Sequence, residues 1–165
     1  VISIAIGLSA GCIPIVGYNM GAGRADRAKE LMKKLLAAEL IVGLAATALF
    51  ECFPQFFVNL FGARQESVYY TQFAVRCIRL FLCTLSLSCF NKGAVIYVQA
   101  LGKAWPSTVL SMIREIGFGV GLPLLLPLLW GLDGLLYFMA LADILAFFIT
   151  VPTLQHLSRS LTAAH

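Results

Sequence analysis

Long runs of apolar residues alternate with short polar or glycine-rich segments along the whole chain. The apolar runs extend from Ile2 to Tyr18, Leu35 to Val58, Tyr69 to Gln99, Trp105 to Trp130 and Leu135 to Leu157. Each run is long enough to cross the roughly 30 Å hydrocarbon core of a membrane as a helix. Backbone polar groups cannot be left unpaired in lipid, so we predict α-helices for all of them. The predicted fold class is therefore all-α, a polytopic transmembrane bundle of about five spans.

The composition supports a membrane protein. Hydrophobic residues make up 60% of the chain and charged residues 12%, against roughly 45–50% and about 25% in soluble domains. The net charge of +4 would suit a nucleic-acid partner only if the basic residues shared one soluble face. They lie between or within the apolar runs instead, so we expect no nucleic-acid partner. Because the chain starts at Val1, already inside an apolar run, we expect it to be a fragment of a longer protein.

The basic residues between the runs predict an orientation, because Lys and Arg accumulate in cytoplasmic loops. Seven of them fall in the first and third separators and at the C-terminal end: Arg24, Arg27, Lys29, Lys33, Lys34, Lys103 and Arg159. Among the other separators, only Arg64 is basic. This asymmetry places those two separators and the C-terminus in the cytoplasm.

The third run is longer than one membrane crossing needs. As a single helix its residues would extend roughly 46 Å, so we expect it to be tilted or to project one end into the interface. Thr84, Ser88 and Asn91 fall within about 60° of one another on a helical wheel. This polar stripe either lines an aqueous pathway or forms interhelical hydrogen bonds. We take Thr84, Asn91 and Arg79 as candidate residues of a substrate pathway.

Two charged residues are predicted to lie near the membrane midplane. Counting from the helix ends places Arg114 about 14 Å and Asp143 about 13 Å into their spans. A charge at that depth costs on the order of 2.5–3.5 kcal/mol, so each side chain should face the protein interior and have a partner. We expect Asp143 to pair with Arg114 or Arg79. Glu115 points about 100° away from Arg114 on a helix and need not pair with it.

Other residues are predicted to lie nearer the membrane surfaces or to shape the helices. We expect Glu39 and Glu51 to reach interfacial water from the two ends of the second run. Tyr97, Trp105 and Trp130 suit interfacial positions. Pro123 and Pro127 remove backbone donors, so they should bend or break the outer half of the fourth run.

Nothing in the sequence predicts enzyme chemistry. His156 and His165 both lie at the C-terminal end, and no catalytic motif or carboxylate pair with metal-ligand spacing is present. The five cysteines stand in apolar surroundings without a C-x-x-C pair. We therefore predict no enzyme activity, no metal site and no bound cofactor.

Several short motifs occur in an order that is familiar from one family. The residues concerned are Pro14, Tyr18, Asn19, Gly21, Ala22, Gly23 and Arg27, the run Gln99 to Lys103, Arg114, the turn Gly131 to Gly134, and Asp143. Together they resemble the multidrug and toxic compound extrusion (MATE) family, in particular its bacterial DinF-like branch. The resemblance covers nearly the whole chain.

This resemblance implies a fold, a function and partners. Proteins of the family have twelve helices in two six-helix lobes, and they export cationic or amphipathic small organic compounds in exchange for protons or sodium by alternating access. Residues 1–165 would correspond to about helices eight to twelve of the second lobe, with the first lobe absent from this sequence. The implied partners are a small organic substrate, membrane lipid and that first lobe. The implied location is the bacterial inner membrane, as a multi-pass protein.

The coupling ion, H⁺ or Na⁺, is expected to bind outside this chain. Sodium-coupled members of the family place an acidic ligand on the helix that corresponds to the third run, yet no Asp or Glu occurs between Glu66 and Glu115. The proton-coupled branch uses aspartates of the first lobe. Two other functions remain open. A lipid-linked sugar flippase of the same superfamily is favoured by Arg76, Arg79 and Arg114, and a helical membrane scaffold would not transport at all.

Overall fold

The computed structural model describes residues 1–60 and 68–163, and these residues form helices and turns but no strand. The elements are α1 (Ile2–Gly21), α2 (Ala25–Cys52), α3 (Pro54–Leu60), α4 (Val68–Leu82), α5 (Leu85–Ala100), α6 (Ala104–Met112), the π-helix η2 (Ile113–Phe118) and α7 (Gly121–Ala163). Helical segments long and apolar enough to span a membrane are Ile2–Gly21, Ala25–Cys52, Tyr69–Ala100, Ala104–Gly131 and Gly134–Ser160. The predicted all-α bundle of five spans is confirmed.

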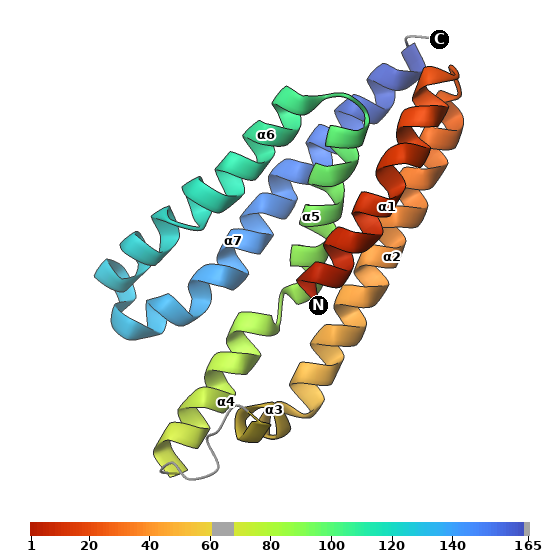
Figure 1. Ribbon diagram of the computed structural model, residues 1–165. Coiled ribbons are helices and arrows are strands. Elements are labelled where there is room, and N and C mark those ends of the chain that lie inside the picture. Colours follow the sequence, from red (N-terminus) through yellow and green to blue (C-terminus); the bar gives the residue numbers. More distant parts are fainter. Residues whose placement is uncertain (61–67, 164–165) are drawn as a thin grey trace.

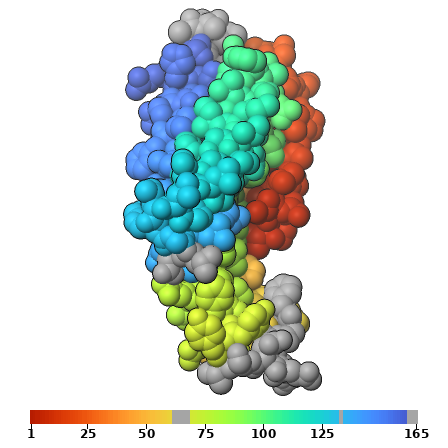
Figure 2. Space-filling model, turned by 90° about the vertical axis from the view of Figure 1, so that its left-hand side faces the viewer, coloured from red at the N-terminus to blue at the C-terminus, as the bar shows by residue number. Residues whose placement is uncertain are grey.

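Helix α5 is the centre of the bundle and contacts α1, α2, α6 and α7 (Figure 1). The α1–α2 turn, the α5–α6 turn and the end of α7 lie at one end of the bundle, and α3 and the start of α4 lie at the other. Figure 2 shows α6 and the first turns of α7 covering one face, with α4 projecting below them. In Figure 1, α4 extends beyond α1 and α6 and lies beside α3. Arg64, which the charge asymmetry places in the opposite loop, lies outside the described residues.

The apolar core forms where α1, α2, α5 and α7 meet. Its buried members are Val16, Leu35, Phe90, Ala94, Tyr97, Val98, Leu154 and Leu157. Tyr97 is only 2% exposed, so its predicted interfacial position is wrong. Its hydroxyl donates a hydrogen bond to the backbone carbonyl of Ala28 at 2.9 Å, and this partner allows the phenol to be buried between α5 and α2.

Replacing Tyr97 with Phe is expected to lower the free energy of unfolding by about 0.5–1.5 kcal/mol, because one buried hydrogen bond is lost while the ring remains packed. Unfolding of the detergent-solubilised protein, followed by circular dichroism, measures the change. Tyr69→Phe is the matched control, since Tyr69 is 81% exposed. A loss that is equal in both variants would show that the Ala28 contact contributes nothing.

Helix α1 ends in a tight turn that needs a glycine. The backbone N–H groups of Gly23 and Arg24 donate to the carbonyls of Met20 and Asn19 at 3.1 and 2.8 Å, which satisfies the last carbonyls of the helix. Gly23 has φ +69°, a conformation that costs glycine little and other residues more. The side-chain amide of Asn19 adds a bond to the Ile15 carbonyl at 2.7 Å.

The third span is not one continuous helix. Helix α4 ends at Leu82 and α5 begins at Leu85, with Cys83 and Thr84 forming a turn between them. The Thr84 hydroxyl donates to a carboxylate on α7 instead of capping its own helix. This bond ties the turn between α4 and α5 to α7.

The fourth span is also irregular. It consists of α6, the π-helix η2, a turn at Gly119 and Val120, and the first turns of α7. Pro123 cannot donate to the carbonyl four residues earlier, that of Gly119, and its ring crowds that carbonyl. The turn lies where this effect of Pro123 is expected, whereas the break predicted at Pro127 is wrong, since α7 continues through Pro127 up to Gly131. Gly131, with φ +60° and ψ −148°, then separates the fourth span from the fifth.

Candidate functional site

A carboxylate on α7 is the centre of the main polar cluster. Asp143 is 2% exposed. Its Oδ1 accepts a hydrogen bond from Arg114 Nη2 at 2.5 Å, and its Oδ2 accepts one from Ser88 Oγ at 2.7 Å. Thr84 Oγ1 lies 3.3 Å from the same Oδ2. A buried carboxylate with an arginine and two hydroxyl partners is electrostatically satisfied.

The polar stripe of α5 faces this carboxylate along its length. Asn91 Nδ2 donates to the backbone carbonyl of Asp143 at 3.0 Å. The stripe predicted from the helical wheel, Thr84, Ser88 and Asn91, is therefore brought to one residue of α7 by the packing of α5 against it. Asn91 is 1% exposed, and its Oδ1 has no hydrogen-bond partner among the described residues.

The π-helix η2 supplies one cation and one acid, Arg114 and Glu115, on the other side of the cluster. Arg114 Nη1 donates to Glu115 Oε1 at 2.8 Å, and Lys92 Nζ of α5 also donates to Glu115 Oε1. The expectation that Glu115 and Arg114 need not pair rested on a regular α-helix. A π-helix is wider and contains more residues per turn, and here both side chains are directed toward α5.

The cluster alternates in charge. Lys92, Glu115, Arg114 and Asp143 form a continuous sequence of ion pairs, two cations and two acids, over α5, η2 and α7. Arg114 also donates to Ser88 Oγ at 2.8 Å. The desolvation cost of each charge is offset by an opposite charge beside it. Among the buried side-chain atoms of these four described residues, Nε of Arg114 is the one without a hydrogen-bond partner.

Arg79 does not belong to this cluster. Its Nε lies 3.7 Å from Glu51 Oε2, and its side chain is 55% exposed. Of the two partners predicted for Asp143, the structure therefore places Arg114 beside it. Of the three pathway candidates, Thr84 and Asn91 contact Asp143, and Arg79 lies elsewhere.

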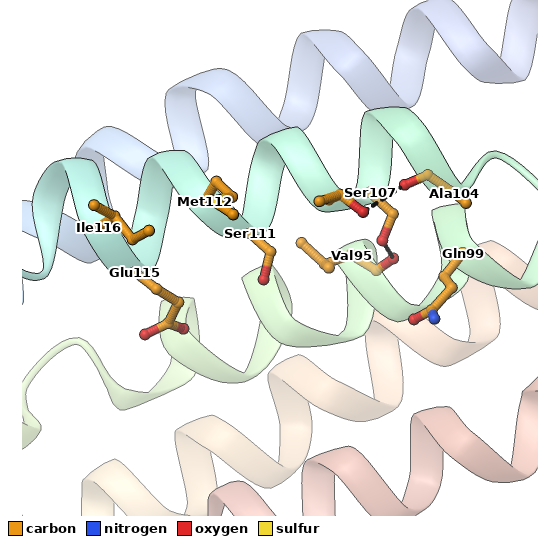
Figure 3. Close-up of a pocket in the computed structure, with 9 residues that line it drawn as sticks. Val95, Gln99, Ala104, Ser107, Ser111, Met112, Glu115 and Ile116 are labelled. Carbon is orange, nitrogen blue, oxygen red and sulfur yellow. Dashed lines mark hydrogen bonds between the residues drawn. The ribbon is translucent and has the colours of Figure 1, made fainter.

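A groove that the sequence did not indicate runs between α5 and α6. Its volume is about 400 Å³, and it is lined by Val95, Gln99, Ala104, Ser107, Thr108, Ser111, Met112, Glu115 and Ile116. Figure 3 shows the Ser111 hydroxyl and the Glu115 carboxylate directed toward α5, and the Ser107 hydroxyl bonded to the Val95 carbonyl. Hydroxyl and carboxylate groups stand beside apolar side chains here, so the lining suits an amphipathic molecule.

Glu39, like Tyr97, lies in a different place from the one predicted from the sequence. It does not reach interfacial water, since its exposed fraction is 0% and it is enclosed by α1 and α5. The sequence contains a pattern that predicts the burial of Glu39. Glu39 stands four residues after Leu35 and four before Gly43, and all three are buried on one face of α2. Residues four apart share a helix face, so a carboxyl between two core residues points into the core.

Neither disulfides nor metal clusters contribute to this interior. Cys12, Cys52, Cys77, Cys83 and Cys89 are all free thiols. Within residues 1–60 and 68–163, no group of three or more His, Cys, Asp or Glu side chains could hold a metal ion. The polar chemistry described for this interior is therefore that of ion pairs, hydroxyls and amides.

Five apolar spans, with buried charges paired between them, define the class of protein: a multi-pass α-helical membrane protein. A family model described as MatE matches residues 1–126. The chain therefore belongs to the MatE family, which consists of membrane transporters. The match includes Arg114, and Asp143 lies beyond it. Comparison with curated proteins and with solved structures finds no match.

Proposed function

We propose that this chain is the larger part of the second lobe of an antiporter, corresponding to about helices eight to twelve. The complete protein, with its first lobe, exports cationic or amphipathic small organic compounds in exchange for protons or sodium. It does so by alternating access, and it resembles the bacterial DinF-like branch. The family match supports a transport function. The interior of the bundle supports alternating access as its mechanism.

The main support is the interruption of the third span beside the charged cluster. In transporters, discontinuous helices at mid-depth mark the site where substrate or ion binds and where the bundle changes shape. Here the break at Thr84 and the π-helix η2 both adjoin Asp143. The turn at Thr84 and the π-helix η2 are already irregular. The bundle can therefore change shape at Asp143 without unwinding a regular α-helix. We propose that Thr84 and Asn91 border the substrate pathway.

The pairing of the cations favours an exporter of organic compounds over a lipid-linked sugar flippase. A flippase of this superfamily tends to line a larger cavity with more cations. Arg79, Lys92 and Arg114 are each paired with a carboxylate in this chain. Their charge is therefore directed to protein partners, and the α5–α6 groove contains Glu115 rather than an excess of cations.

The arrangement of the turns supports a topology. The α1–α2 turn, the α5–α6 turn and the end of α7 lie at the same end of the bundle (Figure 1). Arg24, Lys103 and Arg159 lie at these three places. By the positive-inside rule, this end faces the cytoplasm of a bacterial inner membrane.

The test uses the full-length protein, including the upstream first lobe, in an efflux-deficient bacterial host. We expect it to raise resistance to ethidium and to expel ethidium from loaded proteoliposomes when a proton or sodium gradient is imposed. Asn91→Ala should reduce this efflux, because Asn91 joins α5 to α7 beside the helix break. Thr153→Ala is the polar control, since Thr153 bonds only its own helix at the Ile149 carbonyl.

Other results would contradict the proposal in different ways. Movement of a fluorescent lipid-linked sugar between leaflets, without ethidium efflux, would assign the flippase function. Correct membrane insertion with neither activity would favour the scaffold. Equal efflux in the Asn91→Ala and Thr153→Ala variants would remove Asn91 from the pathway while leaving antiport intact.

A further inference from the structure

Glu39 is a second buried acid, and its surroundings differ from those of Asp143. It lies on α2 with an exposed fraction of 0%. Ser9 of α1 donates a hydrogen bond from Oγ to Glu39 Oε1 at 2.6 Å. On the opposite side, Gly93 of α5 leaves room for the carboxyl group: a Cβ at this glycine would stand 2.8 Å from Glu39 Cγ. The side chain is enclosed by three helices.

No cation compensates this carboxyl group in the part of the chain that the structure describes. Cations of the described residues pair with other acids, for example Lys34 with Glu30, Arg79 with Glu51, Lys92 and Arg114 with Glu115, and Arg114 with Asp143. Oε2 of Glu39 has no hydrogen-bond partner among the described residues. Asp143 is satisfied by an arginine and two hydroxyls, whereas Glu39 has one hydroxyl.

The groups that face Glu39 from the neighbouring helices are known. The thiols of Cys12 on α1 and Cys89 on α5 are close enough to interact with it electrostatically. Two charged residues of α4 and α7 have other partners, since Arg79 pairs with Glu51 and Asp143 with Arg114. Neither thiol can neutralise a carboxylate.

The chemistry of such a site favours a proton over a metal cation. Burying an isolated carboxylate is far more costly than burying a carboxylic acid that lacks one hydrogen bond. Sodium sites in transporters draw on carbonyls freed by unwound helices, but Ser9 and Glu39 both lie inside regular helices. One carboxyl and one hydroxyl offer too few oxygens for a metal ion and enough for a proton.

We propose that Glu39 is a proton-binding site of this transporter. The carboxyl group holds a proton while it is enclosed by Ser9 and Gly93, and releases it when α1, α2 and α5 separate enough to admit water. In that step the Glu39 O–H bond breaks, the electron pair stays on the carboxylate, and the proton passes to water. The inference rests on the proposed antiport, and it places a coupling group inside the chain rather than in the first lobe alone.

The experiment compares Glu39→Gln with wild type in the full-length protein reconstituted into proteoliposomes. Glutamine keeps the shape of the side chain and can still accept from Ser9, but it cannot release a proton. We expect ethidium transport driven by a pH gradient to fall to the level of protein-free vesicles, while ethidium binding in detergent is retained. Substrate-induced proton release into weakly buffered solution, read with a pH dye, should also disappear.

The control is Glu30→Gln, on the same helix. Glu30 forms an exposed pair with Lys34, so its replacement should leave both readouts unchanged. If Glu39→Gln does not fold, Glu39→Asp decides, because a shortened but ionisable side chain should shift the pH dependence of transport. An unshifted profile in Glu39→Asp overturns the proposal.

The outcomes separate this inference from the proposed function. Wild-type pH-driven transport and proton release in Glu39→Gln would overturn the proton site and leave the antiporter intact. Wild-type transport that responds to sodium gradients but not to pH gradients would also overturn the proton site and leave the antiporter intact. Absence of any ethidium transport by the wild type would refute the proposed function itself, and with it the role of Glu39.

Discussion

Replacing Asp143 with asparagine is expected to lower the free energy of unfolding by about 3–5 kcal/mol, the range found when one partner of a buried ion pair is removed. The loss has a specific origin. Arg114 has a side chain that is 14% exposed, so it would remain largely buried without the carboxylate that its Nη2 contacts. Unfolding of the purified full-length protein in mixed micelles, followed by circular dichroism, measures the change.

A matched control and a double variant test that origin. Asp26→Asn, in the exposed first turn of α2, should cost less than about 1 kcal/mol, because only a helix-dipole interaction is weakened. Combining Arg114→Met with Asp143→Leu should recover most of the loss, since both buried charges are then removed and Glu115 keeps Lys92. If the double variant is as unstable as Asp143→Asn, the ion pair is not the source of the effect.

Replacing Gly43 with valine is expected to force α2 and α5 apart. A Cβ at this position would lie 2.5 Å from the Cα of Ser86, a backbone atom that cannot rotate away. Overpacking of this kind costs about 1–3 kcal/mol or more, and it should also disturb Glu39, one turn away on the same face. Thermal unfolding reports the stability, and a cysteine cross-linking series between α2 and α5 reports their separation.

The control for this second prediction is Gly7→Val on α1. No described atom lies within 4 Å of a Cβ built at Gly7, so the same substitution meets no obstacle within this chain. We expect unfolding close to wild type. A similar loss in both variants would mean that the close approach of α2 and α5 does not limit stability.

Hydropathy and charge predicted the spans well, because every segment that crosses lipid must be apolar and must pair its backbone polar groups within a helix. The pairing of Arg114 and Asp143 followed from the same reasoning, since a charge at depth requires a partner. The break at Thr84 could not be predicted in this way. Thr84 at this break bonds an acceptor that is distant in sequence, the carboxylate of Asp143 on α7.

The errors at Glu39 and Tyr97 have a common cause. Both were placed by residue type and distance from a helix end, as amphipathic groups that seek the interface. Both lie instead on helix faces that are covered by neighbours and have hydrogen-bond partners there, Ser9 and the Ala28 carbonyl. Position around the helix, rather than position along it, decided their environment.

The alternation of charge among Lys92, Glu115, Arg114 and Asp143 has an electrical consequence. Each elementary charge moved across a membrane potential of 100 mV is worth about 2.3 kcal/mol. The formal charges of these four residues cancel, so a displacement of the group as a whole along the membrane normal does no net work against the field. The membrane voltage can therefore neither drive nor oppose that movement, and its influence is left to charges that enter or leave the protein.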